Sequence, residues 1–500
     1  MDKDLVIPLS PQPKRSLRER VWHMFQTSKL NNPLGIGIVI LVSACITFGI
    51  AKYGMMVGIA AIIAMVGMPV VYGVVAYPRF GIIIFLIMAY LIMWFYKMGV
   101  NFPLGTLMDG MEGLFILSLF IKQRQNKDWS IFKGPVTTMI LIWIGYNVLE
   151  VANPSAESRQ AWIYTIRTVA VVMFMYFIFL YFITTKKYIR LIFKLWIGLA
   201  FFAALYAFKQ EHIGFFPFEE AFLHSDPNIE LLLFIGGVWR KFSIFSDPVA
   251  FAYNMVTASL LCIGLMTGPI ATYKKVILGL LVIFFTLNML YSGTRGADVL
   301  IPASLLLLAI MKYNKKILML SIMGAVFLLG VIFMPSGNQT INRFQSAFKP
   351  SDDASFNLRK MNQKRIQPYI QTHPLGGGLG STGEWGQRFA PNSYLANFPP
   401  DSGYVRVAVE LGWLGLGIFC MLMFTILKTG ISNYYKIRDP ELKSYCLAVT
   451  LVVFALNFGN YPQEALVQYP TNIYFYLVVA LMTITLRIDQ QQNNTAHAQQ

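Results

Sequence analysis

The sequence is poor in charge for its length. Of its 500 residues, 13% are charged, whereas a soluble domain carries about 25%. Hydrophobic residues make up 56% of the chain, and its mean hydropathy is +0.55. This balance excludes an ordinary soluble enzyme and indicates a protein that crosses a membrane several times.

Cysteine and histidine are also scarce. The four cysteines, Cys45, Cys262, Cys420 and Cys446, all lie in apolar runs, so we expect neither a disulfide nor a thiolate metal site. No cluster of His, Cys, Asp or Glu has the spacing of metal ligands, and no serine lies in a nucleophile elbow. We therefore predict no metal and no other cofactor.

Acidic residues are outnumbered by lysine and arginine, 24 to 41, which gives a formal net charge of +17. A charge of this size is one signature of a nucleic-acid-binding protein. Here most of the basic residues lie in short segments between apolar runs, which is the pattern that the positive-inside rule produces. We expect membrane lipids around the chain and no nucleic acid partner.

Long apolar runs are what the sequence has in abundance. Each is close to the roughly 20 residues that a helix needs to span a bilayer. They predict an all-α polytopic membrane protein with about 12–14 transmembrane helices. The runs begin near Pro33, Met55, Gly81, Leu104, Pro135, Trp162, Ile189, Pro248, Val276, Ala297, Ile317, Ser402, Ser444 and Tyr469.

The basic residues also predict the orientation. The first 32 residues carry six lysines and arginines and no apolar region with a cleavage site, as expected of a cytoplasmic tail rather than a signal peptide. Threading the runs from this tail places most of the remaining basic clusters on the same side of the membrane. We predict that both termini are cytoplasmic.

Two extracytoplasmic segments are too long to be simple connections. Within the longer one, apolar residues from Leu358 to Ile370 recur at helical spacing and predict an amphipathic helix over 355–372 at the membrane surface. The predicted parts are a basic cytoplasmic tail (1–32), a transmembrane bundle (33–334) with a smaller extracytoplasmic segment (211–247), a large extracytoplasmic loop (335–401), C-terminal transmembrane helices (402–488) and a disordered cytoplasmic tail (489–500).

The large loop contains a glycine-rich stretch, QTHPLGGGLGSTG, at residues 371–383. Gly378, Gly380 and Gly383 match a dinucleotide fingerprint in spacing but lack its βαβ context, and Glu384 stands where a phosphate-binding loop needs lysine. Two interpretations remain. The glycines form a turn that packs tightly, or their N–H groups approach a phosphate while His373 acts on a nearby hydroxyl.

Two pairs of charged residues lie near the ends of apolar runs. Arg295, in YSGTRGADVL, faces the bundle interior or a polar cavity, where Asp298 would hold it, or else it snorkels to the interface. A guanidinium fork in such a cavity suits pyrophosphate oxygens. Arg406 precedes Glu410 by four residues, the spacing of a helical ion pair. Either this pair is structural, or Glu410 orients Arg406 toward a substrate.

Taken in order, these stretches resemble the O-antigen ligase/O-antigen polymerase superfamily of bacterial membrane glycosyltransferases. The resemblance covers about 240–428. It rests on SGTRGA (292–297), HPLGGGLG (373–380), Arg359 fourteen residues before His373, YVRVAVELGWLGLGIF (404–419) and, more loosely, Arg240 in WRKFSIFSDPVAFAY. The chain departs from the family pattern at Gln363, where tryptophan is common, and at Asp401–Ser402, where a His-Asn pair is common.

The resemblance implies an activity and a location. It implies transfer of a glycan from an undecaprenyl-pyrophosphate carrier to a glycan, lipid or protein hydroxyl, at the periplasmic face of the bacterial inner membrane. His373, Arg295 and Arg359 would be catalytic, and the large loop would be periplasmic. Substrate contacts would come from Arg240, Arg365, Arg406, Tyr404 and Glu410. The choice between polymerase and ligase stays open, because the acceptor is not identified.

Two other functions compete with this hypothesis. A transporter or flippase for lipid-linked glycans also binds polyprenyl carriers, but such proteins often show internal repeats and charges near the bilayer midplane. The sequence has no visible repeat, and its charges concentrate at the outer ends of the runs. A non-catalytic membrane scaffold is the remaining alternative.

Overall fold

The computed structural model describes residues 33–53, 69–99, 104–235, 237–313 and 354–498, together with a few single positions. The chain forms two compact units, Met1–Gly73 and Val74–Gln500. The first unit contains the described helix α2 (Pro33–Tyr53), and the second contains all the elements discussed below. The predicted tail 1–32 and the predicted spans at Met55 and Ile317 lie outside the described residues.

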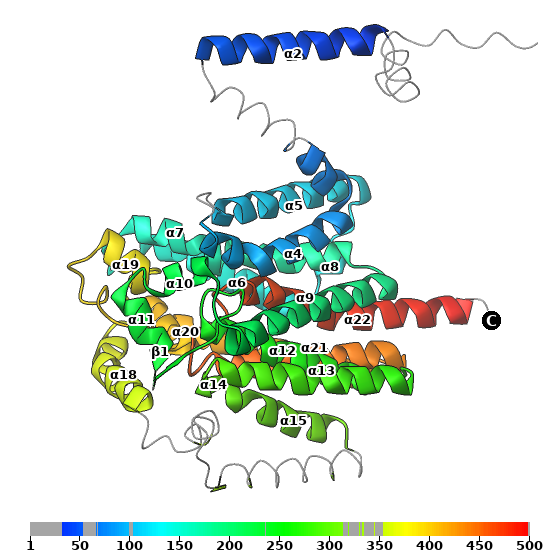
Figure 1. Cartoon of the computed structure of the whole chain (residues 1–500). Coiled ribbons are helices and arrows are strands. Elements are labelled where there is room, and N and C mark those ends of the chain that lie inside the picture. Colours follow the sequence, from blue (N-terminus) through cyan, green and yellow to red (C-terminus); the bar gives the residue numbers. More distant parts are fainter. Residues whose placement is uncertain are drawn as a thin grey trace, which may run out of the picture. The chain divides into compact units, whose positions relative to one another are not determined.

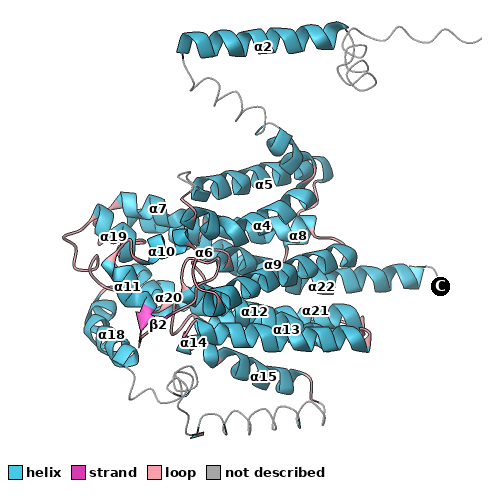
Figure 2. Ribbon diagram, viewed as in Figure 1, coloured by secondary structure: helices cyan, strands magenta, loops and turns pink. Residues whose placement is uncertain are grey.

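The second unit is helical almost throughout, apart from one two-stranded sheet that pairs β1 (Phe234–Ile235) with β2 (Val238–Trp239) (Figures 1 and 2). The all-α fold predicted from the composition is confirmed. Its helices are α4 (Pro78–Lys97), α5 (Leu104–Asn126), η1 (Ser130–Phe132), α6 (Pro135–Leu149), η2 (Glu150–Ala152), α7 (Arg159–Val169), η3 (Val171–Met173), α8 (Phe174–Phe182), α9 (Lys186–His212), α10 (Pro217–Leu223), α11 (Pro227–Leu233), α12 (Pro248–Met266), α13 (Thr272–Tyr291), α14 (Arg295–Asp298), α15 (Leu300–Met311), α18 (Ala354–Thr372), α19 (Gly383–Phe389), α20 (Gly403–Lys436), α21 (Pro440–Gly459) and α22 (Thr471–Ala498).

Nine helical stretches among the described residues are long and apolar enough to span a membrane, so the chain is a multi-pass membrane protein. The predicted spans at Leu104 and Ala297 fall on the described helices α5 and α15, which are not among the nine, whereas those at Met55 and Ile317 lie outside the described residues. The nine are Pro78–Lys97, Pro135–Ala152, Arg159–Phe182, Lys186–His212, Pro248–Met266, Thr272–Tyr291, Gly403–Lys436, Pro440–Gly459 and Thr471–Asn494.

Several helices begin where an aspartate precedes a proline. Asp247 accepts hydrogen bonds from the nitrogens of Val249 (2.8 Å) and Ala250 (3.0 Å), and Pro248 occupies the first helical position of α12. Asp439 and Pro440 start α21 in the same way. The carboxylate accepts hydrogen bonds from N–H groups that have no partner within the helix. Proline has no N–H group of its own, and none is needed at the first helical position. These dipeptides therefore fix where the membrane helices start.

The core of the unit is formed by α12, α21 and α22. About four fifths of the most apolar window of each of these helices is buried (78%, 78% and 83%), against 17% for α13. Helix α12 packs against α13 and α21, and α21 packs against α22. The contact between α12 and α21 is close because Gly264 lies directly on Ala448. Helix α13 therefore presents most of its apolar side chains outward, as a lipid-facing helix does.

The short helices gather at one end of the unit. Figure 1 shows α10, α11, α18 and α19 at the end opposite to the C-terminal part of α22. The helix predicted over 355–372 is observed as α18. Its apolar side packs Ile366 and Tyr369 against Leu395, Phe398 and Val409, so this helix is fixed to the rest of the loop and to α20.

Replacing Gly264 by valine is expected to lower the thermal unfolding midpoint of the detergent-solubilised protein. The new side chain would collide with the Ala448 backbone, and overpacking of this kind costs about 1–3 kcal/mol. Gly279→Val is the matched control, because the nearest atom to a Cβ there is the Met266 Cε, 3.7 Å away. Equal midpoints for the two variants would contradict the close packing of α12 on α21.

Candidate functional site

Helix α20 is interrupted at Gly412, nine residues after it begins. The φ and ψ angles of Gly412 are 68° and −176°, which are not helical. The interruption breaks the ladder in which each carbonyl accepts from the N–H four residues later. The carbonyls of Val409, Glu410 and Leu411 therefore need other donors, and inside a membrane protein water does not supply them.

The glycine-rich stretch supplies most of these donors. The nitrogens of Gly377 and Gly378 donate to the carbonyls of Val409 and Glu410, both at 2.9 Å. In return the Leu414 nitrogen lies 3.4 Å from the carbonyl oxygen of Pro374. A Cβ at Gly376, whose φ is 73°, would collide with the Gly412 nitrogen, so only glycine fits there.

Tyr146 of α6 completes the set by donating from Oη to the carbonyl oxygen of Leu411 at 2.8 Å. The break in α20 is thus joined to the loop after His373 through main-chain hydrogen bonds, and to α6 through the side chain of Tyr146.

The side chain of Glu410 extends the same interface. It is buried, at 2% exposure, and its Oε2 accepts from the Gly380 nitrogen at 3.0 Å. Its Oε1 accepts from both the nitrogen and the hydroxyl of Thr382. The N–H groups of the glycine stretch are therefore directed at this helix and not at a phosphate. These bonds fit the tight-packing interpretation of the glycines, and the role of His373 stays a prediction.

Arg406 lies between two carboxylates. Its Nε donates to Glu410 Oε1 at 3.0 Å, and its Nη1 donates to Glu464 Oε2 at 2.8 Å. Burial raises the pKa of Glu464, the charges of Glu410 and Asp401 add to the shift, and Arg406 opposes it. These bonds tie the loop to the turn before α22, and the predicted substrate contacts of Arg406 and Glu410 stay predictions.

His373 caps the end of α18 and lies on the ring of Tyr369. The two rings are stacked with centroids 4.0 Å apart and planes 10° from parallel. The imidazole Nδ1 lies 3.0 Å from the carbonyl oxygen of Tyr369 and 2.9 Å from the hydroxyl of Thr372. Because a carbonyl oxygen only accepts, this contact favours the tautomer with the proton on Nδ1 and leaves Nε2 as the basic nitrogen.

The arginine turn between α13 and α14 is held by Arg240. The Arg240 Nε donates to the carbonyl oxygen of Ser292 at 2.8 Å, and its Nη2 donates to the hydroxyl of Thr294 at 3.0 Å. Thr294 in turn donates to the carbonyl oxygen of Pro248 at 3.2 Å. Arg240 therefore positions the turn that carries the half-buried Arg295.

Tyr253 connects this turn with Arg359. A Cβ at Gly296, the neighbour of Arg295, would lie 3.4 Å from the Tyr253 Oη, and this hydroxyl donates to the carbonyl oxygen of Gly459 at 2.8 Å. Arg359 interacts electrostatically with both Tyr253 and Asp401. Burial raises the pKa of Asp401, and the charge of Arg359 opposes that shift.

The two remaining predicted residues lie further from these contacts. Tyr404 is half-buried, and its hydroxyl bonds to Asn457 of α21 while its ring packs on Phe419. Arg365 is exposed on α18, with its guanidinium carbon 5.8 Å from the centre of the Tyr394 ring. The structure thus joins Arg240 to the arginine turn, and Arg406 to Glu410.

Residues 280–420 match a family model described as O-antigen ligase. This match covers less than a third of the chain, and it supports the assignment of the region to the O-antigen ligase/polymerase superfamily. The matched residues run from α13 to the first half of α20, and they include Arg295, Arg359, His373, Arg406 and Glu410. The family assignment made from the sequence is confirmed, and it identifies a glycosyltransferase-like enzyme. No curated protein matches the chain.

Sequence reasoning missed several residues of this ligase-type region. Tyr369 precedes His373 by four residues, and that helical spacing was a usable signal. Tyr253 is the last residue of the quoted stretch WRKFSIFSDPVAFAY, but nothing in that stretch marked it as a contact of the arginine turn. Glu464 lies in loop sequence outside the quoted motifs and gave no signal. Among the described residues, no group of three or more His, Cys, Asp or Glu side chains is arranged to hold a metal ion.

Replacing Glu410 by alanine is expected to loosen the loop that follows His373. The change leaves Arg406 with one of its two carboxylates and frees the donors of Gly380 and Thr382, and breaking a buried pair costs about 3–5 kcal/mol. Limited proteolysis should cut the loop faster than in wild type. Glu384→Ala, an exposed position on α19, is the control. Wild-type resistance in Glu410→Ala would show that Glu410 does not hold the loop.

Proposed function

We propose that this protein transfers or polymerises glycan from an undecaprenyl-pyrophosphate-linked donor onto an acceptor hydroxyl at the periplasmic face of the bacterial inner membrane. The observation that carries the proposal is the geometry of His373. Its ring is stacked on Tyr369 and its Nδ1 faces a carbonyl oxygen, so Nε2 is set to receive a proton. The ligase-type family match supports the reaction class.

The proposed chemistry is a single displacement. Nε2 of His373 accepts the proton of the acceptor hydroxyl as the hydroxyl oxygen bonds to the anomeric carbon. The bond from that carbon to the pyrophosphate oxygen breaks, and undecaprenyl pyrophosphate leaves with the electron pair. The donor supplies its own leaving group, so the reaction as proposed requires neither a nucleotide nor a metal.

The arginines are proposed to stabilise the charge that develops on the leaving group. Arg295 lies in the turn that Arg240 holds, and Arg359 lies on α18, the helix that ends at His373. Arg359 is also the partner of Asp401, at one of the positions where the chain departs from the family pattern. Arg240 is proposed to act by positioning the turn, since its guanidinium is bonded to Ser292 and Thr294.

The proposed location follows from the distribution of charge. The short helices and the glycine loop lie at one end of the helical unit, and α22 runs to the C-terminus at the other (Figure 1). The end that contains the starts of α9, α13 and α21 carries basic clusters, as a cytoplasmic end does. The loop end would then be periplasmic, and both termini would be cytoplasmic.

Replacing His373 by alanine should lower kcat for glycan transfer by about 10²–10⁴-fold, because a general base is lost, while KM for the lipid-linked donor changes little. Transfer is measured in proteoliposomes with a lipid-linked oligosaccharide donor. His224→Ala, which removes a mostly exposed histidine from the smaller outer segment, is the control and should retain activity. Wild-type kcat in a correctly inserted His373→Ala protein would refute the assignment.

Arg295→Ala should reduce transfer, and Arg295→Lys should restore only part of it, because an ammonium group lacks the planar fork that matches pyrophosphate oxygens. The same proteoliposome assay measures both variants, with Arg388→Ala on the exposed face of α19 as the control. Full restoration by lysine would show that only a point charge is needed there. Wild-type activity in Arg295→Ala would exclude any role in leaving-group stabilisation.

The glycans that accumulate in a strain lacking this protein distinguish a polymerase from a ligase. Short lipid-linked repeats are expected if the chain is a polymerase, and full-length lipid-linked polymer is expected if it is a ligase. Normal glycans attached to their usual acceptor would contradict both.

A further inference from the structure

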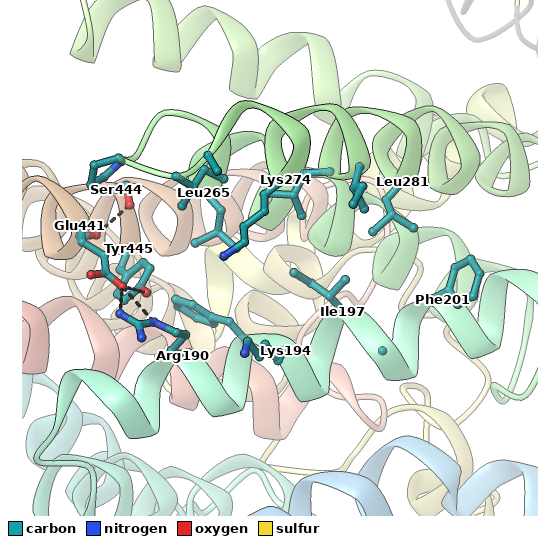
Figure 3. Close-up of a pocket in the computed structure, with 17 residues that line it drawn as sticks. Arg190, Lys194, Ile197, Phe201, Leu265, Lys274, Leu281, Glu441, Ser444 and Tyr445 are labelled. Atoms are coloured by element: carbon teal, nitrogen blue, oxygen red, sulfur yellow. Dashed lines mark hydrogen bonds and ion pairs between the residues drawn. The ribbon is translucent and has the colours of Figure 1, made fainter.

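A second feature of the molecule lies away from the glycine loop. A cavity of about 850 Å³ lies between α9 and α13 and reaches the start of α21. Its walls are mainly apolar. They include Phe193, Ile197 and Phe201 of α9, and Leu278 and Leu281 of α13. All these residues come from the first two thirds of α9 or the first half of α13, so the cavity lies toward the end of the bundle opposite to the arginine turn and α18 (Figures 1 and 3).

Two lysines enter this apolar cavity from facing helices. Figure 3 shows Lys274 of α13 extending toward α9, where Lys194 lines the same space. Arg190 also lines the cavity, but its Nη2 is paired with Glu441 Oε1 at 2.6 Å. Lys186 shares Glu441 as well, at 2.9 Å. The nearby carboxylate, Glu441, is thus already paired with Arg190 and Lys186. No ion pair joins Lys194 or Lys274 to any described carboxylate.

The position of Lys194 along its helix gives its positive charge a free-energy cost. It is eight residues from the start of a span of 27 residues, or about 12 Å along the axis. A cation at this depth beside apolar walls is unfavourable unless an anion accompanies it or the side chain reaches the interface. Lys274 lies closer to a helix end, two residues from the start of α13. The two lysines that line one cavity also repel each other, and a single anion between them reduces both costs.

We propose that this cavity binds an anionic phospholipid, whose phosphate lies between Lys194 and Lys274 and whose acyl chains follow the apolar walls toward Phe201 and Leu281. The chemistry favours a lipid over a soluble phosphate because the walls are apolar over most of their length. Helix α13 buries 17% of its apolar window, so lipid reaches this surface directly. The site is independent of the proposed glycan transfer, whose residues lie at the other end of the bundle.

Native mass spectrometry of the full chain tests the proposal. The protein in detergent is titrated with phosphatidylglycerol or with phosphatidylcholine of the same acyl chains. Wild type should retain one phosphatidylglycerol in preference to phosphatidylcholine. The double variant Lys194→Ala/Lys274→Ala should bind it about thirtyfold more weakly, and Lys194→Arg/Lys274→Arg should bind it nearly as well as wild type.

The matched control is Lys428→Ala/Lys436→Ala, which removes two exposed lysines of α20 that do not line the cavity. The thermal midpoint without added lipid shows that each variant is folded. The proposal is overturned by equal retention of the two lipids or by undiminished binding in the Lys194/Lys274 alanine variant. Displacement of the lipid by millimolar inorganic phosphate would show a soluble-anion site instead, and stoichiometric displacement by undecaprenyl phosphate would show a polyprenyl site.

Discussion

The main-chain hydrogen bonds at the break in α20 determine the arrangement of everything around the candidate site. Gly412 interrupts the helix at a place where water does not replace the missing donors. The stretch after His373 must therefore approach the helix closely enough for Gly377 and Gly378 to bond to it. Side chains at Gly376 and Gly412 would prevent that approach. The close approach to the broken helix therefore accounts for the glycines at Gly376 and Gly412.

The same constraint explains the buried charges beside the break. Glu410 lies two residues before Gly412 and needs partners because it is buried. It obtains them from Gly380, Thr382 and Arg406, and Arg406 reaches on to Glu464 in the turn before α22. Burying two carboxylates around one guanidinium is stable only when each group is hydrogen-bonded. The network therefore adds little net stability by itself, but it permits one position of the loop relative to α20 and α22.

The sequence was sufficient for the features that depend on local pattern. The helix over 355–372, the all-α membrane class and the ion-pair spacing of Arg406 and Glu410 follow from periodicity and composition. The glycine stretch could not be interpreted in this way, because the acceptors of its N–H groups lie about thirty residues later in α20. Arg240 was expected to contact substrate, yet its guanidinium holds the turn at Ser292 and Thr294. The positions of those carbonyl and hydroxyl oxygens depend on how α12 and α13 pack, which no local pattern gives.

The cations at the two ends of the bundle differ in their partners within the protein, and this difference suggests different roles. At the loop end, Arg406 is enclosed by carboxylates and Arg240 is bonded to main-chain and hydroxyl oxygens, so both guanidinium groups are held by partners within the protein. The chemistry proposed for this end relies on His373, whose ring is oriented through Nδ1 by Tyr369, so that Nε2 is not used to hold the ring in place. At the other end, Lys194 and Lys274 meet in an apolar cavity while Glu441 is committed to Arg190 and Lys186. A charge that the protein leaves for an external anion is a binding feature, whereas a charge that the protein neutralises itself is a structural one.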